Sequence, residues 1–114
     1  MDEYSDTQGR TTIDPSVIIK IAKLTALNVP GVSRMASGPH PVNSLLKKNY
    51  LDGILLDVEN NTVYADLYVV LSNDIDLHGT SLEIQEKVSR AITEMVGMDV
   101  GKINIHIEDI DYTN

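Results

Sequence analysis

Cysteine is absent from this 114-residue sequence, as is any long run of apolar residues. Without cysteine the chain can form no disulfide, uses no catalytic thiol and builds no cysteine zinc site. No apolar stretch approaches the roughly 20 residues that cross a bilayer as a helix. The acidic start, Met1 to Asp6, lacks the basic and apolar regions of a signal peptide. We therefore expect a cytoplasmic protein that does not insert directly into a membrane.

Positive charge is scarce as well. Nine lysines and arginines stand against 17 aspartates and glutamates, which gives a net charge of −8. The only adjacent basic pair is Lys47-Lys48. Nucleic acids and anionic membrane surfaces are polyanions, so this balance opposes non-specific binding to either of them. A protein partner is the more natural expectation.

Several short motifs of known chemistry are missing. The sequence contains no glycine-rich phosphate loop and no Gly-x-Ser-x-Gly nucleophile elbow. A KH-like nucleic-acid-binding module remains the alternative, because that fold also combines a few helices with three strands. Its Gly-x-x-Gly clamp does not occur in this sequence. These absences favour a chain that is not an enzyme and needs no cofactor or metal.

Two amphipathic helices are predicted. Asp14-Pro15 is a typical helix start, because aspartate caps free amides and proline suits the first helical position. The helix that follows has a core-facing stripe at Val17, Ile18, Ile21 and Leu24, with Ile19 and Ala26 on the opposite side. It ends at Asn28–Gly31.

The second helix is expected from about Ser81 to Val96. Thr80 and Glu83 have the spacing of a capping box, and Gly97 is a natural C-cap. Its apolar stripe consists of Ile84, Val88, Ala91, Ile92 and Met95.

Alternating apolar residues predict the strands, at residues 54–58, 62–71 and 102–110, with brief ones at 10–13 and 32–36. Residues 37–50 are expected to form a mobile loop that could contain one short helix within 42–50. The predicted fold is α+β, a two-layer sandwich in the order β-α-(β)-β-β-α-β. Both helices would pack on one face of a mainly three-stranded sheet. We expect a flexible tail at 1–8 and a single domain at 9–112.

Two groups of polar residues are candidate sites. Asn73, Asp74, Asp76 and His78 could ligate a hard cation, but these residue types also favour turns and helix starts. Asp57, Asp66 and Glu108 lie in strands and could converge, but the sequence gives no sign of the enclosing pocket that acid–base chemistry needs. His106 alternates with isoleucines and is expected to be solvated. The structural interpretation is favoured for all of them.

The sheet face turned away from the core offers a candidate binding surface. Its residues Leu55, Tyr64, Tyr68 and Val70 are apolar for a wetted surface. Tyrosine is common at interfaces because it combines contact area with a polar tip. We expect these four residues to bind a partner, unless the N-terminal segment or the 37–50 loop covers them.

The order of these segments resembles the bacterial alkaline shock protein family, also called the envelope stress response family. The likeness covers about residues 9 to 112 and rests on these segments: Gly9–Ile13, Val17 with Ile21-Ala22, Val29–Val32, Gly53–Val58, Val63–Leu71, Ala91–Met98 and Val100–Ile107. The 37–50 loop, with its Gly38-Pro39-His40-Pro41 run, departs from the family pattern.

The resemblance implies a non-enzymatic scaffold for cell-envelope homeostasis and stress response. It implies a cytoplasmic protein that associates with itself and is held near the membrane by a partner, such as a membrane-anchored envelope protein.

Overall fold

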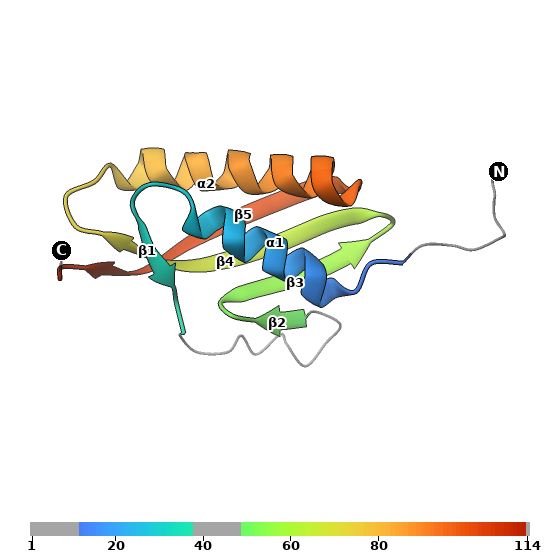
Figure 1. Cartoon of the computed structure of the whole chain (residues 1–114), viewed down its shortest axis with the longest axis horizontal. Coiled ribbons are helices and arrows are strands. Elements are labelled where there is room, and N and C mark those ends of the chain that lie inside the picture. The colour runs from blue at the N-terminus through green and yellow to red at the C-terminus, as the bar shows by residue number, and fades with distance from the viewer. Residues whose placement is uncertain (1–11, 38–48, 114) are drawn as a thin grey trace, which may run out of the picture.

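A computed structural model describes residues 12–37 and 49–113 of the chain. Its elements follow in the order α1 (Pro15–Leu27), β1 (Val32–Met35), β2 (Asn49–Leu51), β3 (Ile54–Glu59), β4 (Thr62–Ser72), α2 (Leu77–Ala91), the π-helical turn η2 (Ile92–Val96) and β5 (Asp99–Asp111). Both helices pack against one sheet (Figure 1). The predicted two-layer α+β fold is confirmed.

The brief strand expected at 32–36 forms as β1, and the strands differ from the prediction at two places. The sheet has five described strands rather than mainly three, and Asn49 and Tyr50 belong to β2 instead of a short helix. Thr12 and Ile13 lie in no strand. The rest of the expected strand at 10–13, the tail at 1–8 and most of the loop at 37–50 lie outside the described residues.

Strand β4 is the centre of the sheet. Along one edge it pairs in parallel with β5 from Thr62 to Ser72. Along its other edge it pairs antiparallel with β3 and then, further on, with β1. Parallel neighbours need a crossover connection, and α2 supplies it between β4 and β5 (Figure 1). The sheet is therefore mixed.

The core lies between the helices and one face of β4. The alternation predicted over residues 62–71 buries five alternate residues there to at most 2% exposure; they are Val63, Ala65, Leu67, Val69 and Leu71. On the helical side, the core contains Ile18 and Ala22 of α1 and Ile84 of α2. The alternation in β4 is therefore confirmed.

The buried side of α1 differs from the predicted stripe. Its buried residues are Ile18, Ile19, Ala22 and Ala26, whereas Val17 and Leu24 are exposed. The start was correct: the Asp14 carboxylate accepts a hydrogen bond of 2.9 Å from the amide of Ser16. Because Ile19 and Ala26 are also apolar, the sequence allowed two orientations of the helix, and packing beside α2 selects this one.

Helix α2 begins earlier than predicted. Asp76 is its N-cap and accepts a 3.1 Å bond from the amide of Gly79, so the proposed capping box at Thr80 was wrong. Ile84, Val88 and Ile92 are buried as expected, but Met95 is exposed. The wider turn of η2 changes the helical phase after Ile92 and directs Met95 outward. Gly97 ends the turn in the left-handed conformation, with φ of 79°.

Candidate functional site

The open face of the sheet is the side turned away from both helices. Strand alternation places on it the residues between those of the core. Its members are Arg34 of β1, Tyr50 of β2, Leu55, Asp57 and Glu59 of β3, Tyr64, Asp66, Tyr68 and Val70 of β4, and Lys102, Asn104 and His106 of β5. The register aligns Tyr64 with Lys102, Asp66 with Asn104 and Tyr68 with His106. All five described strands thus contribute to one surface.

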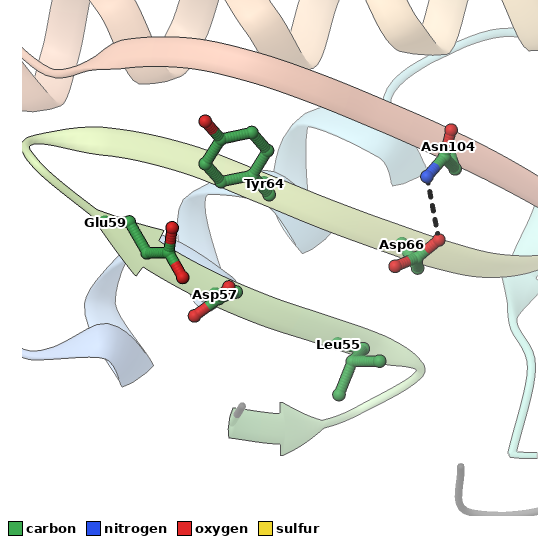
Figure 2. A pocket seen from close by; sticks show the side chains of 6 residues that line it. All are labelled: Leu55, Asp57, Glu59, Tyr64, Asp66 and Asn104. Atoms are coloured by element: carbon green, nitrogen blue, oxygen red, sulfur yellow. Dashed lines mark hydrogen bonds between the residues drawn. The ribbon is translucent and has the colours of Figure 1, made fainter. Parts of the chain in front are cut away.

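A hollow of about 260 Å³ lies on this face, lined by Leu55, Asp57, Glu59, Tyr64, Asp66 and Asn104. Figure 2 shows the Tyr64 ring on one side and the carboxylates of β3 on the other. Three of the six lining side chains are carboxylic acids. The hollow therefore suits a neutral or cationic group better than a phosphate backbone.

A hydrogen-bonded cluster is centred on Asp66. Its Oδ1 accepts from Nδ2 of Asn104 at 3.0 Å and from Nε2 of His106 at 2.9 Å. An ionised carboxylate can only accept, so this nitrogen of His106 is a donor. The Asn104 bond is visible in Figure 2. The cluster ties β4 to β5 on the exposed side of the sheet.

Tyr68 completes that cluster by stacking. Its ring lies on the His106 ring with centroids 4.5 Å apart and planes 12° from parallel. Burial raises the pKa of the Tyr68 phenol, and the nearby Asp66 and Glu108 carboxylates raise that pKa further. The hydroxyl therefore stays protonated at neutral pH, so the face presents a fixed aromatic group with a neutral polar tip.

Tyr64 is held by a glycine on the neighbouring strand. A Cβ placed on Gly101 would lie 2.8 Å from Cζ of the Tyr64 ring, closer than carbon atoms normally approach. The ring of Tyr64 therefore lies over the bare backbone of β5. Its side chain remains 41% exposed, so the residue has a defined position and a free surface.

The four predicted contact residues share the open face but differ in accessibility. Tyr64 is exposed and Tyr68 is half-buried, whereas Leu55 and Val70 are each 4% exposed. The two tyrosines provide the accessible area, and the two aliphatic residues on the same face contribute little to it. Sequence reasoning missed His106 and Asn104 as members of this surface, because aligning them with β4 requires its parallel register with β5.

Two of the other candidate residues, Asp74 and Asp76, have structural roles. Asp76 caps α2, and Asp74 adopts a positive φ of 60° in the turn before it. Glu108 lies where the β4–β5 register shifts, away from the hollow that Asp57 and Asp66 share. Within residues 12–37 and 49–113, no three His, Asp or Glu side chains are grouped to hold a metal ion.

Neither helix in the described part of the chain combines the length and the apolar composition that crossing a bilayer requires.

Comparison with known proteins identifies relatives over nearly the whole chain. The model of the alkaline shock protein family, described as having a cell envelope-related function, matches residues 3–112. YqhY of Bacillus subtilis is 28% identical over 98% of this chain and 84% of its own length. YloU of the same organism is 24% identical over 98% of this chain and 97% of its own length. Spy1535 of Streptococcus pyogenes is 29% identical over 90% and 79%.

Solved structures share the fold at much lower identity. The MamM CTD, residues 215–293, superposes with a TM-score of 0.54 at 14% identity, over 84% of this chain and 99% of that one. A copper form of a MamM CTD variant gives a TM-score of 0.55 at 13% identity, over 86% and 100%. At such identities the likeness concerns the arrangement of helices and strands alone.

Proposed function

Because this chain belongs to the alkaline shock protein family, whose description is a cell envelope-related function, we propose that it is a binding or scaffold protein of the envelope stress response. It acts without catalysis, through contacts between proteins. Its working surface is the open face of the sheet, with Tyr64 and Tyr68 making the contacts.

The observation that carries this proposal is a pair of ordered aromatic rings on the sheet face that neither described helix covers. Tyr68 is stacked on His106, and Tyr64 lies over Gly101, so both rings have fixed positions before any partner arrives. Binding then costs little side-chain entropy, which is one of the main penalties of association. Large amphipathic rings are also the side chains that most often dominate binding energy.

Leu55 and Val70 share the open face with the tyrosines but add little contact area. Each is almost fully buried, so a partner gains little area from them directly. Tyr64 and Tyr68 are therefore the residues to replace in a test of this surface.

Acid–base catalysis fits this face poorly. Glu59 at the hollow is exposed, and paired carboxylates need an enclosing pocket to shift their protonation. The same carboxylates disfavour the alternative function of nucleic-acid binding, since they would repel phosphates.

The partner is a protein, either a membrane-anchored envelope protein or a second copy of this chain. A cytoplasmic scaffold that such a partner holds at the membrane is consistent with the family description. Self-association through the same face would bury the tyrosines of both copies.

The test is crosslinked affinity purification of the tagged full chain from its host, with cytosol and membranes analysed separately. The double variant Tyr64→Ala and Tyr68→Ala should lose the partner that the natural protein retains. Tyr112→Ala is the matched control, because Tyr112 is an exposed tyrosine that lies beyond the end of β5. Unchanged association of a folded double variant would refute the assignment. Recovery mainly of RNA or ribosomal proteins would favour nucleic-acid binding.

A further inference from the structure

A second surface lies on the helical side of the molecule, in a groove between α1 and β2. The groove has a volume of about 550 Å³ and is lined by Ser16, Val17, Ile19, Lys20, Lys23, Leu24, Leu51 and Asp52. Three of its aliphatic side chains are strongly exposed: Val17 at 47%, Leu24 at 54% and Leu51 at 46%. Such a group of large apolar residues on one surface is typical of an interaction site.

The two walls of the groove present these side chains to the same space. Val17, Lys20 and Leu24 follow at spacings of three and four, so they form one strip along α1. Seven residues of helix correspond to about 10 Å, or two turns. Leu51 pairs with the core residue Ile54, which places it on the helical side of the sheet and opposite that strip.

The charge of α1 differs from that of the rest of the chain. The helix carries Lys20 and Lys23 and no acidic residue, within a protein of net charge −8. Lys23 is 3.3 Å from the Asp52 carboxylate, and this pair is exposed enough to be worth little. Lys20 is exposed between Val17 and Leu24.

We propose that this groove binds a short, acidic amphipathic helix from a partner protein. Apolar side chains on one face of such a helix, at spacings of three, four and seven, would fill the space between Val17, Leu24 and Leu51. Carboxylates flanking those side chains would meet Lys20, and one of them would share Lys23 with Asp52. A helix of two to three turns matches the length of the strip.

An extended anionic surface fits the groove less well than one helix does. A bilayer would face a large part of a chain that carries −8, whereas a helix contacts only the positive strip within a Debye length of roughly 8 Å. The groove is also on the opposite side of the sheet from Tyr64 and Tyr68. Both surfaces can therefore be occupied at once, and the groove does not depend on the function proposed for the open face.

A photo-crosslinking experiment in the host identifies the occupant. The full chain carries benzoylphenylalanine at position 24, and a second version carries it at position 82. Leu82 is the matched control because it is an exposed leucine on α2, outside the groove. Position 24 should give a protein crosslink that position 82 lacks. The attached peptide should be acidic, with apolar residues at helical spacing.

Binding of a synthetic peptide with that attached sequence then tests the chemistry. Lys20→Glu should weaken binding about tenfold at low salt, since an attraction becomes a repulsion. Leu24→Ser should weaken it at least as much at any salt concentration. Lys102→Glu, an equal charge reversal on β5, should have no such effect beyond a small long-range change.

Four results would overturn the proposal. They are crosslinks to lipid, crosslinks to a second copy of this chain, the same products from positions 24 and 82, or a captured segment that is basic or lacks helical spacing. The double variant at Tyr64 and Tyr68 separates the two surfaces. It should abolish the open-face association and leave the crosslink at position 24 intact.

Discussion

Replacing Gly101 by alanine is expected to move the Tyr64 ring while leaving the fold intact. The new Cβ would lie 2.8 Å from Cζ and 2.9 Å from Cδ2 of that ring. Cε2 of the ring would be closer still. Ordinary carbon contacts need about 3.5 Å or more, so the ring must shift outward by about 1 Å. Tyr64 is exposed enough to allow this movement.

The change in stability should be small because two effects oppose each other. Alanine reduces the conformational freedom of the unfolded chain and stabilises the fold by about 0.4–1 kcal/mol where the backbone tolerates it. An outward swing of the ring would expose roughly 50 Å² of apolar surface, which costs about 1.3 kcal/mol. The free energy of unfolding should therefore fall by less than about 1 kcal/mol.

Denaturant unfolding measures the change in stability, and the NMR resonances of the Tyr64 ring measure its displacement. We expect nearly unchanged stability, a large shift of the Tyr64 ring signals, and weaker retention of the open-face partner. Gly79→Ala is unsuitable as a control because its Cβ would meet the Asp76 cap. Unchanged Tyr64 resonances in the Gly101→Ala variant would refute the contact, and a loss above about 3 kcal/mol would show that the ring cannot move away.

Three further changes test the fold that supports the site. Leu67→Ala should cost about 2–5 kcal/mol in denaturant unfolding, since Leu67 is fully buried in the central strand; a loss below about 1 kcal/mol would contradict that placement. Asp76→Ala should lower stability by about 1 kcal/mol, whereas Glu83→Gln should not. A larger loss from Glu83→Gln than from Asp76→Ala would instead support the capping box of Thr80 and Glu83 that the sequence predicted. The Ser33 hydroxyl, hydrogen-bonded to Asp111, holds the pKa of that carboxyl at about 2. Because this folded-state pKa is below the ordinary 3.8, the stabilisation is complete above pH 3.8 and is lost as the pH falls toward 2. Asp111→Asn should remove that part of the acid dependence, and an unaltered pH profile of the melting temperature would contradict it.

Local sequence patterns were sufficient to predict the strands that form the core. The strict alternation from Val63 to Leu71 can be satisfied only by burying one face, and the structure buries that face. The buried side of α1 was harder to predict, because its apolar residues occur on two sides of the helix. Tertiary packing chose Ile18, Ile19 and Ala22, and left Val17 and Leu24 outside.

The candidate site was only partly visible in the sequence. Placing Tyr64 and Tyr68 on one face follows from alternation alone. Their fixed orientations depend on His106 and Gly101, which are distant along the chain. That proximity arises from the parallel pairing of β4 with β5, which no local pattern specifies. The accessibility of Leu55 and Val70 was likewise undetermined before the neighbouring strands were placed.

The most direct test of the open-face assignment is fluorine NMR of the full chain with 3-fluorotyrosine at its five tyrosines. Single substitutions assign the signals, and the partner recovered by crosslinking is then titrated. For self-association, the protein concentration is raised instead. We expect the signals of Tyr64 and Tyr68 to shift or broaden, with that of Tyr112 unchanged. Binding that perturbs Tyr112 and leaves Tyr64 and Tyr68 unaffected would contradict the account.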